Sequence, residues 1–488
     1  MNYIEPERRT RVDPGSPLRI AACLVAFVFV LTSTVVAQTR NVVMIVADDM
    51  GYADSGITGV KDFETPHIDS ISRDGVFLRQ AYVTAAVCSP SRAGFLTGRY
   101  QQRFGHEHNG GGGLPFGLPL DQKTMADHFK AAGFATGAIG KWHLGQTPDH
   151  HPMSRGFDEF VGHLGGGHPY YPESDREAGR SREEKILDGR EPAEWDEYLT
   201  DYFGDRAVDF IERHADEPFF LYLSFNAPHT PMQAKDEDLE KVTHIEDDRR
   251  RKYAAMMIAM DRAIGKTLQA LDDAGVADET TIVFFSDNGG PRPGDPSVNG
   301  SQNWPYRSGK AQYFEGGVRV PMFLKVPGVV EPGTRYNRAV SSLDLLPTLL
   351  ASVGKTPLEQ VELDGVNLLP YLTGEKEEAP HERIYFRTGA GVGVIEGDYK
   401  MVVFRREQGL PDNPERPDLA KAKLFNLADD PEEKNELSTQ MPDRFDALIE
   451  VWKTWDETLG QPLWGTWESR PANRAKAGAK ANASEKED

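Results

Sequence analysis

The segment with the most specific chemistry begins at one of the two cysteines of the chain and reads CSPSRAGFLTGR over residues 88–99. Pro90 is compatible with the first turn of a helix, which places Cys88 at the helix N-terminus and Arg92 one turn further along. A helix N-terminus and a nearby guanidinium both stabilise an anion, so these residues by themselves suggest a thiolate nucleophile. For an isolated thiol, a buried structural cysteine is the ordinary alternative.

Two apolar runs end abruptly in pairs of polar side chains. Residues 41–47 are followed by Asp48 and Asp49, and residues 281–286 by Asp287 and Asn288. Strands of a parallel sheet covered on both faces are apolar throughout, and ligands bind beyond their carboxyl ends. These four side chains are hard oxygen donors, suited to Ca²⁺ or Mg²⁺ and poorly suited to zinc. Helix N-capping could explain either pair singly, but it does not explain two carboxylate-rich strand ends.

The elements that must hold these residues alternate along the chain. Further strand-like runs cover residues 219–225 and 320–326, and helical runs cover 123–132, 253–274 and 342–353. This alternation predicts an α/β domain with a large, mostly parallel sheet flanked by helices. After about residue 375 the pattern changes to short strand-like pieces and one final helical run, which predicts a smaller C-terminal α+β domain with an antiparallel sheet. The pieces are 383–387, 391–396, 400–404 and 423–427, and the helical run is 443–458.

The N-terminal residues resemble an export signal. A leader with four arginines precedes an apolar run that starts at Ile20, and the run closes in the small-residue site Val35-Val36-Ala37. An uncleaved membrane anchor is the alternative, because 20–37 falls just short of the roughly 20 residues that a spanning helix needs. We expect a signal peptide at 1–37, a large α/β domain at 38–375, the C-terminal domain at 376–468 and a disordered tail at 469–488. The protein would be periplasmic or secreted, with no stable membrane association after cleavage.

Composition limits the partners. The 488 residues carry 55 Lys and Arg against 76 Asp and Glu, a formal charge of −21. A chain of this charge has no net field that attracts nucleic acid, and an anionic substrate must be held by a local group of cations. With only Cys23 and Cys88, a disulfide scaffold is excluded.

The segment that starts at Cys88 resembles the signature of the formylglycine-dependent (type I) sulfatases, Cys-x-Pro-Ser-Arg followed by Leu-Thr-Gly, with no departure at the key positions. A second similarity covers residues 133–136 and the run GKWHLG at 140–145, with Phe134 where tyrosine is commoner in the family. The resemblance extends over about residues 40–465. It implies an alkaline-phosphatase-like fold, hydrolysis of sulfuric esters, and oxidation of Cys88 to formylglycine by a dedicated maturation enzyme.

The same resemblance gives the polar strand ends a role. The family's metal ligands match Asp48, Asp49, Asp287 and Asn288, and the formylglycine at position 88 is a further oxygen ligand. The implied cofactor is Ca²⁺, with Mg²⁺ as the alternative.

It also implies roles for three cations and two histidines. Arg92 supports the hydrated aldehyde, whereas Lys141 and Lys310 bind the sulfate oxygens. One hydroxyl of the hydrate attacks sulfur while His229 donates a proton to the leaving alcohol, and His143 then helps remove the proton of the second hydroxyl so that sulfate is eliminated. Unmodified chain is therefore expected to be nearly inactive.

The substrate is less narrowly defined. Export and the segments 119–121 and 155–158 look most like arylsulfatase-related enzymes of glycosaminoglycan and algal galactan breakdown, a group that includes N-acetylgalactosamine-4- and 6-sulfatases. We therefore expect a sulfated oligo- or polysaccharide. Candidate sugar contacts are His106, His108, His163 and His168, with Trp304 or Tyr170 as stacking surfaces.

Two alternatives stay open from the sequence. A phosphomonoester or phosphonate hydrolase would use the same metal-site architecture, because cations that bind a sulfate also suit a phosphate. The other alternative is a non-catalytic receptor for sulfated glycans, against which the intact Cys88, the two histidines and the four metal ligands speak.

Overall fold

A computed structural model describes residues 39–110, 116–177, 181, 185–292, 298–389, 391–404 and 417–464. All of them belong to one unit, Ala37–Asp488. The expected signal peptide and the expected disordered tail lie outside the described residues. Among the helices of the described part, none is both long and apolar enough to cross a membrane.

The large sheet has ten strands in the order β10-β2-β9-β8-β1-β7-β3-β4-β5-β6. Its central neighbours β8, β1, β7, β3 and β4 all run parallel, as do β10 and β2, so the mostly parallel sheet is confirmed. The strands are β1 Asn41–Ala47, β2 Val76–Tyr82, β3 Ala135–Lys141, β4 Glu159–His163, β5 Leu187–Asp188, β6 Glu191–Pro192, β7 Phe219–Ser224, β8 Thr280–Ser286, β9 Met322–Lys325 and β10 Thr334–Ser341.

Two strands run against this pattern, β9 and the two-residue strand β5, which is antiparallel to both β4 and β6. β9, which corresponds to the apolar run at 320–326, is antiparallel to both of its neighbours, β2 and β8. An apolar run shows that a strand is buried on both faces but carries no information about its direction. The direction of β9 was therefore not predictable from the apolar run itself.

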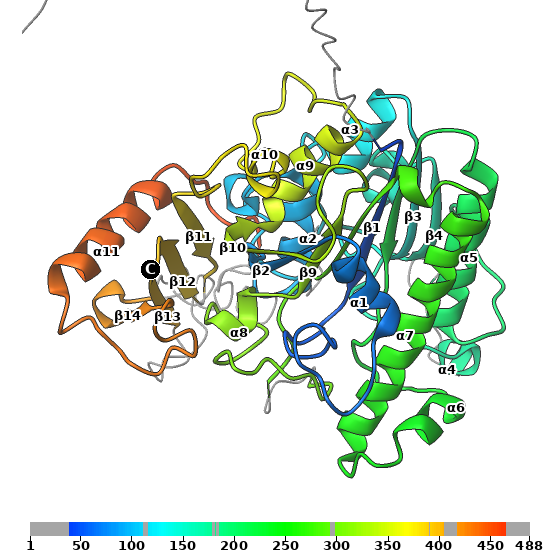
Figure 1. Ribbon diagram of the computed structural model, residues 1–488, viewed down its shortest axis with the longest axis horizontal. Coiled ribbons are helices and arrows are strands. Elements are labelled where there is room, and N and C mark those ends of the chain that lie inside the picture. The colour runs from blue at the N-terminus through cyan, green and yellow to red at the C-terminus, as the bar shows by residue number, and fades with distance from the viewer. Residues whose placement is uncertain are drawn as a thin grey trace, which may run out of the picture. The chain divides into compact units, whose positions relative to one another are not determined.

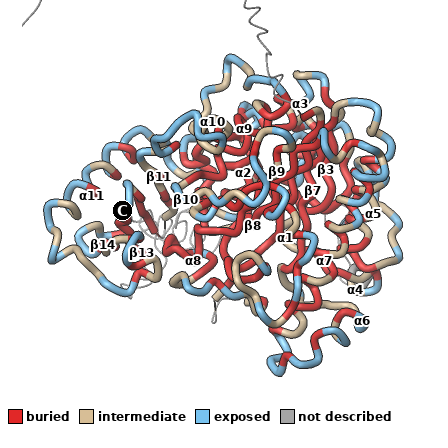
Figure 2. Tube along the Cα trace, viewed as in Figure 1, coloured by how far each residue is buried: buried red, intermediate tan, exposed pale blue. Residues whose placement is uncertain are grey.

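Alternate residues of β1 belong to two separate apolar cores. Val42, Met44 and Val46 lie in one, and Val43 and Ile45 lie in the other. The first core includes α2 (Cys88–Thr97), α3 (Met125–Ala131) and α9 (Leu345–Ser352), and the second includes α1 (Pro66–Arg73), α5 (Leu199–His214) and α7 (Asp248–Asp273). Helices thus cover both faces of the sheet, and the buried chain concentrates along its central strands (Figures 1 and 2). The short helices are α4 Pro172–Glu177, α6 Asp236–Leu239, α8 Glu315–Val318 and α10 Leu369–Leu372.

The predicted helices are confirmed, and local signals fix their ends. Thr124 and Asp127 form a reciprocal capping box at the start of α3. The Asp247 side chain accepts from the Arg250 amide, so α7 begins five residues before the predicted Tyr253. α2 ends at Gly98, which has a left-handed conformation with φ 64°.

The second sheet has four antiparallel strands, β11 Arg383–Arg387, β12 Gly391–Glu396, β13 Tyr399–Phe404 and β14 Lys423–Asn426. α11 (Pro442–Asp456) packs on it through Leu448 and Trp452, which share a core with Val394 and Met401 (Figure 1). The predicted antiparallel C-terminal sheet is confirmed. The boundary between residues 375 and 376 stays a prediction.

A close backbone contact sets the path of β3 just before Lys141. Gly140 has φ 106°, and a Cβ there would lie 1.9 Å from the Ser224 carbonyl oxygen of β7. We expect Gly140→Ala to destabilise the fold by about 3 kcal/mol or more in urea unfolding, from backbone strain and overpacking together. Gly133→Ala is the matched control, because Gly133 has φ 88° and nothing within 4 Å. Equal losses of unfolding free energy in the two variants would show that the contact with Ser224 does not constrain β3.

Candidate active site

The expected site residues gather where the central parallel strands end. Asp48 and Asp49 follow β1, Asp287 and Asn288 follow β8, and Lys141 is the last residue of β3. The loop after β7 carries His229, and Cys88 is the first residue of α2. Neighbouring parallel strands present their carboxyl ends at one edge, so residues far apart in the sequence meet there.

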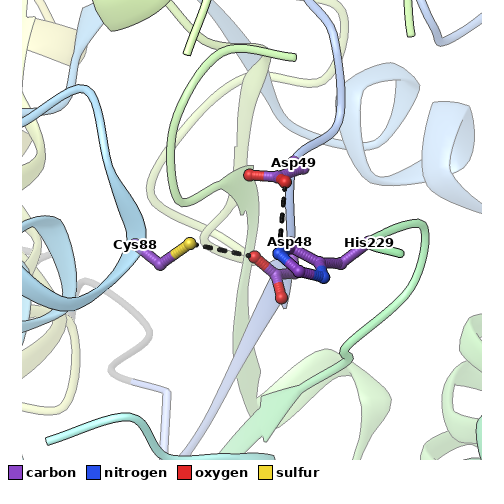
Figure 3. Close-up of side chains that lie close together, drawn as sticks. All are labelled: Asp48, Asp49, Cys88 and His229. Atoms are coloured by element: carbon purple, nitrogen blue, oxygen red, sulfur yellow. Dashed lines mark hydrogen bonds and ion pairs between the residues drawn. The ribbon is translucent and has the colours of Figure 1, made fainter. Parts of the chain in front are cut away.

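The sulfur of Cys88 lies against the acidic strand end. Its Sγ is 3.5 Å from Asp48 Oδ1, and the His229 Nε2 is 3.5 Å from Asp49 Oδ2 (Figure 3). One ligand atom from each of Asp48, Asp49, Cys88 and His229 lies within 4.8 Å of the others. These atoms come from three separate elements and converge on one point.

The acidic residues are linked to one another and carry an unsatisfied acceptor. The Asn288 amide donates to Asp49 Oδ1 at 2.7 Å, and the Asp49 backbone N–H donates to Asp287 Oδ1 at 3.2 Å. Asn288 Oδ1 is buried and has no hydrogen-bond partner. Burial, with the Asp48 charge adding to it, raises the pKa of Asp287 to about 7. A buried group of mutually repelling carboxylates with an orphaned amide oxygen fits a hard divalent cation.

Arg92 is fully buried beneath this point. Its Nε donates to Asp287 Oδ2 at 3.0 Å, and its Nη1 donates to the hydroxyls of Tyr222 and Ser224 at 3.1 and 2.6 Å. The guanidinium therefore has one orientation, because its donors are held by groups on two strands. Tyr222 and Ser224 were not among the expected residues, although they are the only polar side chains of the apolar strand β7.

The two lysines each contact a different carboxylate. The Lys141 Nζ lies 2.6 Å from Asp48 Oδ2, and the Lys310 Nζ lies 2.6 Å from Asp49 Oδ2. Burial by itself raises the pKa of Asp48, but the neighbouring cations, Lys141 foremost, hold it well below its usual range. Each ammonium group is thus paired with one of the two carboxylates that follow β1.

The two histidines are separated by a glycine segment. A Cβ on Gly166 would lie 2.8 Å from His143 Nε2, and one on Gly167 would lie 3.4 Å from His229 Cε1. Burial lowers the pKa of both imidazoles. The His229 Nδ1 lies 2.7 Å from the Thr230 carbonyl oxygen and donates to it, which leaves Nε2 toward Asp49.

The thiolate suggested by the isolated residues is wrong. Burial raises the pKa of Cys88 to about 12, with Asp48 adding to the rise and Lys141 opposing it. A helix N-terminus stabilises an anion, but here the first turn is fully buried beside a carboxylate. The surroundings of Cys88 therefore favour the thiol over the thiolate.

The structure places the expected sugar contacts around the same loops. His106 Nε2 lies 2.7 Å from Ser89 Oγ, whose hydroxyl donates to the His143 carbonyl oxygen. The His108 carbonyl accepts from Trp464 Nε1 at 2.9 Å. The His168 ring is 5.3 Å from that of His163. Their contacts with a sugar stay predictions.

Of the two proposed stacking surfaces, one is corrected. Tyr170 is fully buried, its ring stacks on Tyr198 at 5.5 Å, and its hydroxyl donates to the carbonyls of Asn226 and His229. It supports the His229 loop from behind and offers no face to a sugar. Trp304 is 47% exposed, and its Nε1 donates to Gln302 Oε1.

Asn299 is a supporting residue that the sequence did not indicate. Its amide donates to the backbone carbonyls of Asp49 and Pro228, at 3.1 and 3.0 Å, and so ties the two loops that meet at the site. Nothing in its local sequence distinguishes it from a surface loop asparagine.

The chain is similar in sequence to known proteins. The sulfatase family matches residues 40–355. The human N-acetylgalactosamine-6-sulfatase is 35% identical over 355 residues, which are 69% of this chain and 66% of the human protein, slightly less than two thirds of its length. The mouse N-acetylgalactosamine-6-sulfatase is 30% identical over 451 residues, 84% of each chain.

Solved structures agree in fold. The crystal structure of Ps i-CgsB superposes with a TM-score of 0.81 at 36% identity, over 90% of this chain and 98% of that one. The phosphonate monoester hydrolase of Agrobacterium radiobacter superposes with a TM-score of 0.63 at 21% identity, over 87% of this chain and 97% of that one, which is a likeness of fold alone. The alkaline-phosphatase-like arrangement implied by the sequence is thus confirmed, and the chain belongs to the sulfatase family, whose members are sulfuric ester hydrolases.

Proposed function

We propose that this protein removes sulfate from a sulfated oligo- or polysaccharide, using a formylglycine made from Cys88 and a bound divalent cation. One observation carries the proposal. A buried cysteine in the family's signature lies 3.5 Å from Asp48, and Lys141 and Lys310 converge beside it.

The protein would hold the cation through the oxygens of Asp48, Asp49, Asp287 and Asn288. Ca²⁺ is the proposed ion, with Mg²⁺ as the alternative, and when bound it supplies positive charge that polarises oxygen atoms at the reacting centre. The oxidised side chain at position 88 supplies, as its hydrate, the oxygen nucleophile that a thiol with a pKa of about 12 does not offer.

The cations of the chain bind and orient the substrate. With a divalent ion on the carboxylates, the ammonium groups of Lys141 and Lys310 are available to the sulfate oxygens, where negative charge spreads in the transition state. Arg92 is fixed by Asp287, Tyr222 and Ser224, and its proposed role is to support the hydrated aldehyde at position 88.

The histidines move protons. The Nδ1–H of His229 donates to the Thr230 carbonyl, so Nε2 is the atom that gives a proton to the leaving alcohol oxygen, from a doubly protonated ring that the Asp48 and Asp49 charges favour against the effect of burial. His143 has a buried Nδ1 without a partner and lies across the glycine segment, where it takes a proton from the group at position 88. Burial lowers the pKa of His143, which keeps the ring neutral and so able to accept a proton.

The substrate class rests on the relatives. The names of the N-acetylgalactosamine-6-sulfatases place their sulfate on an amino sugar, and Ps i-CgsB, 36% identical to this chain, has been solved in complex with k-i-k-neocarrahexaose. His106, His108 and His168 are the proposed sugar contacts; His108 is half-buried, whereas the other two are buried. Residues 1–37 are proposed as a cleaved signal peptide, so that the mature protein is periplasmic or secreted and meets its maturation enzyme before or during export.

Matured protein tested against defined sulfated oligosaccharides and matched phosphate esters decides the function. We expect free sulfate from at least one oligosaccharide, with kcat/KM at least about 100-fold above that for the phosphate ester, a difference of roughly 2.7 kcal/mol in the transition state. Faster phosphate release would favour the phosphohydrolase alternative. Tight binding without turnover, in protein whose peptide at position 88 keeps the mass of a thiol, would favour the glycan receptor.

A further inference from the structure

Lys310 is carried by a loop, residues 307–316, whose base is closed by its own backbone. The Gly316 N–H donates to the Arg307 carbonyl at 2.8 Å. On its inner side the Lys310 N–H donates to the Gly290 carbonyl at 3.0 Å, and the Ala311 N–H donates to the Ala86 carbonyl at 2.7 Å. The loop is therefore attached to the segment after Asn288 and to the segment before Cys88.

The backbone of this loop is strained. Ser308 and Ala311 have φ of 66° and 69°, in the left-handed region that residues other than glycine rarely adopt. In the described part of the chain the other such residues are Asp49, His143 and Glu433. Strain of this kind persists only where the surroundings hold it and clusters at functional sites. Four of the five residues lie in the site or beside Lys310, and Glu433 is the exception.

Glu433 lies after the last strand of the second sheet, yet it contacts the Lys310 loop directly. Its Oε2 accepts from the Glu315 N–H at 2.7 Å, and its backbone carbonyl accepts from the Arg307 guanidinium at 3.0 Å. Both ends of the loop are thus attached to one residue of the C-terminal region, 118 positions from Glu315.

Lys400, on β13, completes the contact. Its Nζ donates to Glu315 Oε1 at 2.8 Å and lies 3.1 Å from Glu433 Oε1, and all three side chains are fully buried. We call Glu315, Lys400 and Glu433 the charge clamp. Tyr82, on β2, adds a hydrogen bond from its hydroxyl to Glu315 Oε2 at 2.9 Å.

A buried group of charges is a poor source of stability, because desolvation offsets the attraction between the partners. Burial raises the pKa of Glu433 to about 7, which shows how costly its charge is at this place. An apolar contact of the same volume would hold two sheets together as well. Directed bonds to both ends of one strained loop instead fix its position.

We propose that Glu315, Lys400 and Glu433 are positioning residues through which the C-terminal sheet fixes the Lys310 loop, and with it the place of the Lys310 ammonium group on the sulfate. This inference rests on the role proposed above for Lys310. The test therefore has one part that needs no substrate and one part that does.

The first part is amide hydrogen exchange of the loop. Glu433→Gln keeps the side-chain size and one acceptor oxygen but removes the charge that faces Lys400, and we expect residues 307–316 to exchange about tenfold faster or more. Glu396→Gln is the matched control, because Glu396, on β12, pairs with Arg383 of β11 and Arg444 of α11 and not with the loop. This control should leave the exchange rates of residues 307–316 unchanged. Unchanged exchange in Glu433→Gln would overturn the clamp.

Tyr82→Phe is a milder second variant if Glu433→Gln fails to fold. It removes only the hydrogen bond to Glu315 and should raise exchange in the same residues. Faster exchange spread evenly over the whole chain, with none specific to 307–316, would mean general destabilisation and would count against the clamp.

The second part is a double-mutant cycle with Lys310→Ala. Glu433→Gln alone should lower kcat/KM about 10- to 100-fold, as a small displacement of a binding group does. In the Lys310→Ala background it should lower kcat/KM less than about twofold, because the group it positions is gone. Additive losses would show that Glu433 does not act through Lys310. If the unaltered protein releases no sulfate from any ester, the proposed function fails, and the exchange experiment still decides the clamp.

Discussion

Cys88→Ala is expected to reduce sulfate release at least about 10⁴-fold, to the level of the assay background, because it removes the only side chain proposed to attack sulfur. The fold should be kept. Alanine removes one buried sulfur atom at the start of α2, and a small deletion in a well-packed core costs about 1 kcal/mol. Kinetics on a sulfated oligosaccharide together with thermal unfolding check both parts.

A matched comparison uses the same sequence in two chemical forms. Protein produced with and without the maturation enzyme differs only at position 88, and mass analysis of the peptide that contains it gives the fraction converted. Activity should rise in proportion to that fraction. A preparation that keeps the thiol on every molecule and is fully active would contradict the formylglycine assignment.

Residues close together in sequence carried most of what could be predicted. The run at 41–47 is β1 as the structure has it, and Cys88 opens α2 as Pro90 indicated. The expectation that Asp48 and Asp287 meet followed from a general property of parallel sheets, and the structure links Asp287 Oδ1 to the backbone of Asp49 at 3.2 Å. The local sequence pattern, and the rule that neighbouring parallel strands end at the same edge of a sheet, were sufficient for these predictions.

The remaining features depend on contacts between distant residues. The direction of β9, the burial of Tyr170 and the clamp at Glu433 are each decided by neighbours that are not adjacent in sequence. The thiol of Cys88 shows the same limit. Its position at a helix N-terminus predicts a lowered pKa, whereas its burial raises the pKa. Charge and position along the chain do not determine how much water reaches a group.

Removal of the divalent ion is expected to abolish activity and to lower stability while the protein stays folded. A ligand that binds only the folded state stabilises it by about 2.7 kcal/mol at a concentration 100 times its dissociation constant, and a chelator should remove that contribution. Lys141 and Lys310 already pair with Asp48 and Asp49, so two of the buried carboxylates keep a partner and the site does not force the chain to unfold.

The same pairs explain why activity should be lost completely. Without the ion, each lysine is held by a carboxylate and is not available to a sulfate, so substrate binding and catalysis fail together. Adding back Ca²⁺, Mg²⁺ or Zn²⁺ one at a time, with release of sulfate and thermal unfolding as readouts, identifies the ion. We expect Ca²⁺ or Mg²⁺ to restore both and Zn²⁺ to restore neither, because the donors are hard oxygens.

A matched pair of substitutions assigns the effect to the site. Asp287→Asn removes one of the three carboxylates of the proposed cation site, the one that pairs with Arg92 at 2.9 Å, so Ca²⁺ should no longer raise the unfolding temperature. Asp261→Asn changes a buried carboxylate that accepts from the backbone N–H groups of His67 and Ile68, and it should keep the full response to Ca²⁺. If chelation leaves both activity and the unfolding curve of the unaltered protein unchanged, the acidic strand ends do not hold a metal, and the orphaned oxygen of Asn288 needs another partner.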